Sequence, residues 1–361
     1  MKQINIGIIG VGLIGNTHAM TLMTCIEEEV FKGKAEIKLK GFADVDENVL
    51  KQRGGLYDVD FLTKNGHELC ESKDIDTIYI CTPTRFHHEF FMSAVKNGKN
   101  VFVEKPVGTS TQVKEMIQAR DEHKATVQVG LVLRYEPLFW YIKKGMDEHK
   151  KDFGPLQNII FRDDQEYPYT GSGNHPSTWR ADKAVAYHGT LFEHSIHDLD
   201  ELIYYCGKVD SLAASIKFFN KKEEIEDSAS VLLNFKNGTT ASLNSIWYAV
   251  NRDSRRGEFY FKNAVMEFDA SMIGTGSLQY KILNQPTTKV STSEMTAAFL
   301  KEVFPGLKVP PGLSYFYENV GFMRSIIENK PTYPGLEIAL EVHEILEKCY
   351  ESSRLTKFLN K

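Results

Sequence analysis

A glycine-rich segment near the N-terminus constrains the fold of this chain more than any other feature. The segment reads Gly10-Val11-Gly12-Leu13-Ile14-Gly15, and it lies between an apolar run, residues 3–9, and a helical stretch, residues 14–32. In this context the first glycine permits a tight turn, the second lets the backbone approach a pyrophosphate, and the third lets the helix pack on the strand. The free N–H groups of the helix then face the phosphates. The segment predicts a dinucleotide site; a glycine-rich turn without a ligand is the alternative.

Strands and helices alternate through the first 130 residues. Apolar runs that predict strands occur at 3–9, 37–43, 77–81, 100–103 and 126–130, with helical segments between them at 14–32, 86–97 and 110–123. Strands separated by helices of this length form right-handed crossovers and a parallel sheet. We therefore expect an α/β Rossmann domain, with a doubly wound parallel sheet, over residues 1–133.

The pattern changes from Arg134 onward, where long strands follow one another. They are expected at 156–162, 211–219, 229–235, 239–247 and 257–268, and Asn237-Gly238 between two of them is a strong hairpin signal. Helices are expected near 179–205, 315–328 and 335–353. This pattern predicts an α+β domain with a mainly antiparallel sheet over residues 134–361.

Composition narrows the class of protein. The chain has 361 residues, enough for two domains, and its net charge of -5 without a long Lys/Arg run argues against nucleic acid as a partner. Five scattered cysteines without a C-x-x-C pair favour a reducing compartment over disulfides or zinc. The N-terminus lacks a signal-peptide layout, and no apolar run approaches the ~18 residues of a membrane span. We expect a cytoplasmic protein without a membrane partner.

An acidic residue at the end of the second predicted strand bears on the choice of cofactor. Asp44 follows the strand 37–43 and can accept both ribose hydroxyls of an adenosine, although its spacing of 29 residues from Gly15 exceeds the usual ~20. A carboxylate there repels a 2′-phosphate, so NAD is favoured and NADP remains the second possibility. The alternative interpretation is an aspartate that caps the next helix.

The first candidate for chemistry is Glu104-Lys105-Pro106. It follows the predicted strand 100–103, at the carboxyl edge of the sheet where doubly wound folds bind ligands. Partial burial lowers the pKa of a lysine, which can then exchange a proton with a substrate hydroxyl. A surface lysine at a strand end is the alternative.

The second candidate spans Glu193 to Asp200. On one continuous helix Glu193, His197 and Asp200 share a face, with His194 beside them, and a histidine between carboxylates suits a general base near neutral pH. A metal site that includes His188 is a rival interpretation, but no H-E-x-x-H or cysteine set is present, and we expect no metal. A solvated amphipathic helix is the third.

Taken in order, these motifs resemble those of the glucose–fructose oxidoreductase/inositol dehydrogenase family, often written Gfo/Idh/MocA, over nearly the whole chain. The matching segments are the glycine segment, Ile80-Cys81-Thr82-Pro83-Thr84 with His87, Val103-Glu104-Lys105-Pro106, Arg134-Tyr135-Glu136-Pro137, Trp179-Arg180, and Glu193, His197 and Asp200. The resemblance implies an open-faced sheet in the second domain, which often pairs with another subunit. It therefore implies a homodimer or homotetramer.

The resemblance also implies roles for single residues. Lys105 is then the catalytic lysine, His197 the acid/base, and Glu193 the residue that orients the substrate hydroxyl. The expected cofactor-binding residues are Gly10, Gly12, Leu13, Ile14, Gly15, Asp44, Thr82, Pro83, His87, Glu104 and Lys105. The expected substrate-binding residues are Arg134, Tyr135, Trp179, Arg180, His194 and Asp200.

Two positions depart from the family pattern and leave the substrate open. Glu193 stands where most members have Asp, and Ser195 stands where glycine is usual. The family also suggests a cis peptide at Lys105–Pro106, and residues 163–175 resemble a mobile loop near the sugar pocket, with an ordinary surface loop as the alternative.

The function implied by the resemblance is an NAD(P)-dependent oxidoreductase. Its substrate would be a sugar, a sugar acid or a cyclitol, and hydride would pass between a hydroxyl-bearing carbon and the nicotinamide. One alternative is an NAD-dependent enzyme that cleaves glycosides through transient oxidation. Another is a dinucleotide-binding sensor without turnover, which the presence of both Lys105 and His197 argues against.

Overall fold

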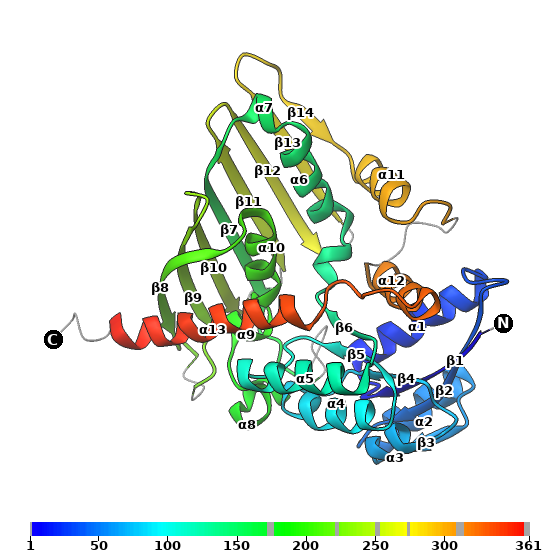
Figure 1. Ribbon diagram of the computed structural model, residues 1–361. Helices are drawn as coiled ribbons and strands as arrows, with labels where there is room; N and C mark the ends of the chain where they lie inside the picture. The colour runs from blue at the N-terminus through cyan, green and yellow to red at the C-terminus, as the bar shows by residue number, and fades with distance from the viewer. Residues whose placement is uncertain are drawn as a thin grey trace. The chain divides into compact units, whose positions relative to one another are not determined.

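The computed structural model describes residues 2–171, 177–220, 224–249, 253–272, 275–307 and 314–356. Its contacts divide the chain into two units (Figure 1). The first unit contains Met1–Val132 and Gly312–Glu341, and the second contains Leu133–Pro311 and Val342–Lys361. The sequence pattern placed the domain boundary between residues 133 and 134, one residue after the point where the chain first passes from one unit to the other. It assigned residues 312–341 to the second domain, whereas their contacts place them in the first unit.

The first unit is built on a six-stranded sheet in the order β3-β2-β1-β4-β5-β6. The strands are β1 (Lys2–Ile9), β2 (Ala35–Ala43), β3 (Phe61–Thr63), β4 (Thr77–Ile80), β5 (Asn100–Glu104) and β6 (Val127–Gly130). Every pairing is parallel. The order reverses direction at β1, which confirms the doubly wound fold and places the topological switch point, where such folds bind ligands, between β1 and β4.

Helices and short turns connect these strands. They are α1 (Leu13–Glu27), α2 (Glu47–Tyr57), α3 (Gly66–Glu71), η1 (Thr84–Phe86), α4 (His87–Lys96) and α5 (Ser110–His123), joined by the late helix α12 (Ser314–Glu328). The α1 helix stops at Glu27 rather than at residue 32, because the chain turns there and Glu29 adopts a left-handed φ of +51°. The sequence pattern missed α2, β3 and α3.

α12 packs against α1 although about 300 residues separate them in the chain. Its Phe322 lies 5.8 Å from the ring of Tyr79 on β4 and 5.7 Å from that of Phe102 on β5. All three rings are buried. The late segment therefore completes the apolar cover of this sheet.

The second unit is built on an eight-stranded sheet in the order β14-β13-β12-β11-β7-β10-β9-β8. The strands are β7 (Leu156–Glu166), β8 (Val209–Lys217), β9 (Ser228–Phe235), β10 (Thr240–Tyr248), β11 (Ser254–Phe261), β12 (Ala264–Met272), β13 (Thr275–Ile282) and β14 (Thr288–Val290). Only β7 and β10 pair in parallel; the other neighbours are antiparallel. The mainly antiparallel sheet is thus confirmed.

Two predictions within this sheet were wrong. The run 257–268 is not one strand but parts of β11 and β12, which turn at Lys262-Asn263. The expected loop 163–175 begins inside β7, which continues to Glu166, and its residues 172–175 lie outside the described residues. Strands β13 and β14 had no clear signal in the sequence.

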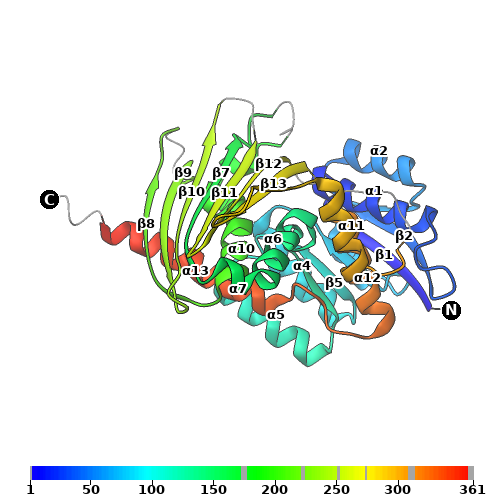
Figure 2. The ribbon, with the colours of Figure 1, turned by 90° about the horizontal axis from the view of Figure 1, so that it is seen from above.

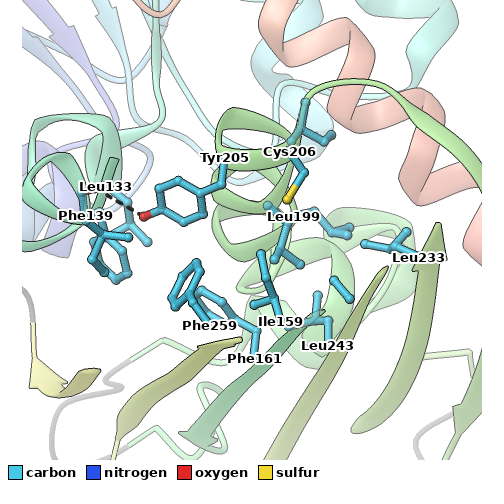
Figure 3. Close-up of a cluster of buried hydrophobic side chains, with 14 of the residues drawn as sticks. Leu133, Phe139, Ile159, Phe161, Leu199, Tyr205, Cys206, Leu233, Leu243 and Phe259 are labelled. Atoms are coloured by element: carbon cyan, nitrogen blue, oxygen red, sulfur yellow. Dashed lines mark hydrogen bonds between the residues drawn. The ribbon is translucent and has the colours of Figure 1, made fainter. Parts of the chain in front are cut away.

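Helices cover one face of this sheet (Figure 2). They include α6 (Pro137–Glu148), α7 (Lys150–Phe153), α9 (Thr190–Glu193), α10 (Ile196–Cys206) and α11 (Thr292–Val303), with η2 (Val132–Tyr135) before them. The final helix, α13 (Leu336–Thr356), has residues in both units. The core joins Leu199 and Tyr205 of α10 to Phe161 and Phe259 of the sheet (Figure 3), and the Tyr205 hydroxyl donates to the carbonyl of Phe139 at 3.3 Å.

The expected helix 179–205 is broken into four pieces, η3 (Trp179–Ala181), α8 (Lys183–Ala186), α9 and α10. Tyr187 after α8 adopts a left-handed φ of +67°. Gly189 lies so close to Glu226 that a Cβ would come within 1.8 Å of its carbonyl oxygen. The tertiary contact therefore fixes the break. Across the described part of the chain, none of the helices combines the length and the apolar character that a membrane crossing requires.

Candidate active site

The glycine loop of the first unit divides its three glycines into two kinds. Gly10 has a φ of +84°, and a Cβ there would lie 2.7 Å from the carbonyl oxygen of Cys81. A Cβ on Gly15 would lie 1.9 Å from the carbonyl oxygen of Gly10. Gly12, in contrast, has no atom within 4 Å of its Cβ position among the described residues other than its own neighbours in the chain. The fold itself needs the first and third glycines, whereas the second leaves space where a ligand can approach.

The N-terminus of α1 is open to an anion. Gly12 is the N-cap residue, and no side chain of the described residues caps this first turn. The first N–H groups of a helix lack partners within it and carry a partial positive charge. Leu13 and Ile14 supply the next backbone positions, so this turn suits a pyrophosphate.

Asp44 lies at the end of β2 and is fastened to the glycine loop. One carboxylate oxygen accepts the N–H of Val11 at 2.8 Å, and the other accepts the N–H of Asp46 at 3.0 Å. The alternative role of helix cap belongs instead to Asp46, whose side chain accepts the N–H groups of Asn48 and Val49 at the start of α2. Contact between Asp44 and a ribose stays a prediction.

The loop after β4 holds Thr82, Pro83 and His87. The Thr82 hydroxyl oxygen is buried and lacks a hydrogen-bond partner among the residues that the structure describes. Such a group needs a partner, and a cofactor amide or hydroxyl fits that need. The buried His87 ring instead faces two carbonyls, Thr82 at 2.7 Å and Pro106 at 2.8 Å. Burial lowers the pKa of His87, and these carbonyls oppose the shift. His87 therefore joins two loops of the site.

Glu104 and Lys105 lie where β5 ends. Glu104 is buried, and one of its oxygens accepts the N–H of Lys105 at 3.1 Å. The Lys105 side chain is half-buried, as a lysine that meets both protein and solvent should be. The Lys105–Pro106 peptide bond is cis, as expected.

In the second unit, Glu193 ends α9 and is fully buried. Its carboxylate accepts a hydrogen bond from the Arg180 Nε at 3.1 Å. The Arg180 guanidinium in turn lies 4.2 Å from the centre of the Trp179 ring. Three of the expected site residues are therefore brought together around one buried charge.

The histidines follow at the helix break. The Trp247 indole donates to His194 Nδ1 at 2.7 Å, so that nitrogen carries no proton. His197 is the second residue of α10 and is buried. The idea that Glu193, His197 and Asp200 share one continuous helix was wrong, because α9 ends at Glu193 and α10 begins at Ile196.

Arg134 and Asp200 bind each other. The guanidinium holds both carboxylate oxygens of Asp200 at 2.7 Å, and it lies 4.1 Å from the centre of the Tyr204 ring. Both charged groups are buried. Tyr135 is also buried, and its ring lies 6.2 Å from that of Phe304. These contacts stabilise the fold around Arg134, Tyr135 and Asp200. The expected contact of these three residues with a substrate stays a prediction.

The sequence analysis missed a network of polar side chains close to the histidines in the fold. The Ser195 hydroxyl donates to Asp163 at 2.7 Å and lies 2.6 Å from the hydroxyl of Ser245. Arg255 pairs with Asp198 at 2.8 Å, and its guanidinium lies 3.5 Å from Asp163. Burial and the neighbouring Asp163 raise the pKa of Asp198. These partners come from distant strands, so no local pattern signals them; Ser195 in the place of glycine was the one hint.

The rival metal set of His188, Glu193, His194 and His197 is not assembled. Within the described ranges, the one group with metal-ligand spacing is His18, Glu104 and Glu318 in the first unit. His188 lies against Tyr350, with ring centres 3.9 Å apart.

Comparison with known proteins agrees with this architecture. Residues 4–131 match a family model described as an oxidoreductase family with an NAD-binding Rossmann fold, and residues 149–267 match the GFO/IDH/MocA C-terminal domain. Fold and loops together define a nicotinamide-dependent oxidoreductase. The chain belongs to the GFO/IDH/MocA family.

Individual relatives are similar at moderate identity. The uncharacterized oxidoreductase YrbE of Bacillus subtilis (strain 168) is 28% identical over 266 residues, which cover 72% of each chain. Inositol 2-dehydrogenase of Rhizobium meliloti (strain 1021) is 25% identical over 248 residues, 67% of this chain and 68% of the relative. A structure of levoglucosan dehydrogenase in complex with NADH superposes with a TM-score of 0.82 at 20% identity, covering 98% of this chain and 97% of that one. This last likeness shows the fold alone.

Proposed function

We propose that the protein oxidises a secondary hydroxyl of a sugar, sugar acid or cyclitol with NAD as the hydride acceptor. The observation that carries the proposal is the pairing of buried Glu193 with Arg180 one helix break before His197. Glu193 then supplies a carboxylate held in place by Arg180, and His197 supplies an acid/base group four residues further along the chain. Inositol 2-dehydrogenase among the relatives agrees with the substrate class.

In the proposed reaction the substrate loses one hydride and one proton. A bound nicotinamide would accept the hydride from carbon, and the hydroxyl proton would pass to His197 while a carbonyl forms. Lys105 polarises the oxygen or relays the proton, and Glu193 orients the hydroxyl. The family motifs, rather than any distance, join Lys105 and His197 in one mechanism.

The preference for NAD over NADP rests on Asp44. A carboxylate at the end of β2 repels a 2′-phosphate, and its hydrogen bond to Val11 keeps it beside the glycine loop. The open space at Gly12 and the buried hydroxyl of Thr82 fit a nicotinamide dinucleotide.

The test is turnover of a substrate panel by the purified full-length protein. NAD or NADP is supplied with inositols, aldoses, sugar acids and levoglucosan, and the absorbance of the reduced nicotinamide is followed. We expect NAD reduction with at least one polyhydroxylated substrate. Lys105→Ala and His197→Ala should each lower kcat by about a hundredfold or more, as loss of a general acid–base does. Lys96→Ala, an exposed lysine on α4, is the matched control.

Three outcomes would contradict the proposal. Undiminished turnover by Lys105→Ala would remove the lysine from the mechanism. Tight NAD binding without NAD reduction by any member of the panel would instead favour a sensor. Glycoside cleavage with only catalytic amounts of NAD would favour the transient-oxidation mechanism.

A further inference from the structure

A buried polar cluster lies behind Lys105 in the first unit, and the reaction proposed above leaves most of it unexplained. His18 comes from α1, Glu104 from the end of β5, and Glu318 and Asn319 from α12. All four side chains are buried. An unpaired charge in such a place is costly, so the positions of the protons must be worked out.

The hydrogen bonds fix the proton on one nitrogen of His18. The Thr21 hydroxyl donates to the carbonyl of Thr17 at 2.9 Å, so it accepts from the Asn319 amide nitrogen at 2.8 Å. The amide oxygen of Asn319 then faces His18 Nδ1 at 3.1 Å. Since that oxygen can only accept, Nδ1 carries a hydrogen.

The other nitrogen of His18 reaches Glu104. His18 Nε2 lies 2.9 Å from one carboxylate oxygen of Glu104, a distance that requires one proton between them. The second oxygen of Glu104 accepts the N–H of Lys105 at 3.1 Å. Glu104 is thus held from behind by His18 and in turn holds the main chain of Lys105.

Glu318 is the member without a partner. Its side chain is completely buried, and neither of its oxygens has a hydrogen-bond partner among the described residues. A potential ligand atom of Glu318 lies within 4.8 Å of those of His18 and Glu104. Burial raises the pKa of Glu318, and the neighbouring carboxylate of Glu104 raises it further.

A count of charges decides the state of Glu318. With a hydrogen on Nδ1 and one proton shared with Glu104, the His18–Glu104 pair is neutral wherever that proton lies. An ionised Glu318 would therefore leave a buried negative charge that nothing in the pair offsets, whereas a protonated Glu318 makes the whole cluster neutral.

We propose that Glu318 is a neutral carboxylic acid in the folded protein, and that it and His18 are positioning residues which keep Glu104 in place under Lys105. The positioning role rests on the proposed function of Lys105. The other titratable groups that face Glu318 are Tyr79 from β4 and Cys81 after it, and burial raises the pKa of both well above their ordinary values. They stay protonated in the range where Glu318 is tested.

The same three groups have the spacing of a divalent-metal site, which would also neutralise the two carboxylates. Two observations favour protons over a metal. His18 Nε2 and Glu104 are already at hydrogen-bond distance from each other, and the second Glu104 oxygen is used by Lys105. The metal is therefore an outcome of the test.

The first experiment measures the charge state of Glu318 without any need for activity. Glu318→Gln imitates the neutral acid. We therefore expect the melting temperature of the variant, relative to that of the wild type, to rise by about 5 °C as the pH rises from about 5 to about 8. The sign follows because the folded wild type keeps a proton that its unfolded chain loses. A constant difference across this range would overturn the neutral state.

The second experiment tests positioning with two replacements of His18. His18→Gln keeps a donor for Glu104, and His18→Leu removes it. We expect His18→Leu to lower kcat by about tenfold or more with little change in the KM for NAD, and His18→Gln to restore most of it. The reactivity of Lys105 is measured by acetylating a small fraction of the protein and comparing Lys105 with the exposed Lys96 by mass spectrometry. We expect this ratio to change several-fold in His18→Leu but not in His18→Gln.

The outcomes separate this inference from the proposed function. If the wild type turns over no substrate, the proposed function fails, yet melting and acetylation still decide the present inference. Unchanged acetylation and kcat in His18→Leu would refute the positioning role. One equivalent of divalent metal in the purified full-length protein, lost in Glu318→Gln together with stability at every pH, would show a metal site instead.

Discussion

The carboxylate of Asp44 accepts the N–H of Val11 at 2.8 Å, which fastens the acid at the end of β2 to the glycine loop. Asp44→Asn keeps an oxygen for Val11 but removes the charge. We therefore expect the ratio of kcat/KM for NADP to kcat/KM for NAD to rise by about tenfold or more. A tenfold rise corresponds to the loss of about 1.4 kcal/mol of repulsion between the carboxylate and the 2′-phosphate. Asp46→Asn, which retains the cap of α2, should leave the ratio unaltered.

The glycine loop predicts opposite behaviour for two alanine variants. Gly12→Ala places its methyl group in open space, so the free protein should keep its melting temperature while NADH binding weakens by about tenfold or more. Gly15→Ala drives a methyl group into the carbonyl of Gly10 and should lower the melting temperature of the free protein. Thermal melts and NADH fluorescence separate the two. Weaker folding in Gly12→Ala would show that the space is not available for a ligand.

Glu193 is one methylene longer than the aspartate of most family members, and Arg180 holds it at 3.1 Å. Glu193→Asp withdraws the carboxylate from this partner. We expect kcat/KM for the preferred substrate to fall by about tenfold and the ranking of substrates to change. Glu193→Gln, which keeps the length but not the charge, shows which property matters. An identical ranking in Glu193→Asp would rule out a role in specificity.

We expect Glu226 to make the stability of the second unit depend on pH. It is buried against the N–H groups of Gly189 and Leu191 and the hydroxyl of Tyr350, and burial raises its pKa from its ordinary 4.5 to about 7. The folded state then keeps a proton that the unfolded chain loses. The free energy of unfolding should fall by about 3 kcal/mol as the pH rises from about 4.5 to about 7.

The control for this effect is the difference between the wild type and Glu226→Gln in urea melts. His188 acts in the opposite direction, because burial lowers its pKa to about 4 and stability is gained as the pH rises towards its ordinary value. Subtracting the variant removes this contribution. A difference that does not vary with pH would mean that Glu226 titrates normally.

Two large apolar side chains are exposed on neighbouring parts of the second sheet. Leu232 of β9 and Ile160 of β7 both pair with Ser242 of β10, and they are 61% and 41% exposed. The family resemblance implies that this sheet pairs with another subunit. Leu232→Lys combined with Ile160→Lys should then yield monomers in light scattering. Leu283→Lys, an equally exposed leucine after β13, should not.

Local patterns were enough for much of the fold. The glycine segment and the alternating strands identify the first unit because each is encoded within a few consecutive residues. Gly10 has a positive φ, Gly15 is closely packed, and Gly12 has free space beside it. Glu104 and Lys105 could be proposed as site residues for the same reason, since they lie at the end of a buried strand.

The rest depends on partners far apart in the chain. The helix break between Glu193 and Ile196 is anchored by Ser195, whose hydroxyl bonds Asp163, and no helical periodicity reveals that contact. His18 and Glu104 are 86 residues apart, and His18 and Asn319 are 301 apart. The sequence contains these residues, but only the folded chain shows that they meet.

The return of α12 to the first unit has a consequence for biosynthesis. During translation the strands of the six-stranded sheet emerge from the ribosome long before α12, the helix that covers Tyr79 and Phe102. The nascent chain therefore carries an exposed aromatic surface until α12, residues 314–328, has been made, and chaperones bind such surfaces. A fragment ending at residue 132 would keep that surface permanently and should aggregate, even though it contains every glycine of the nucleotide loop.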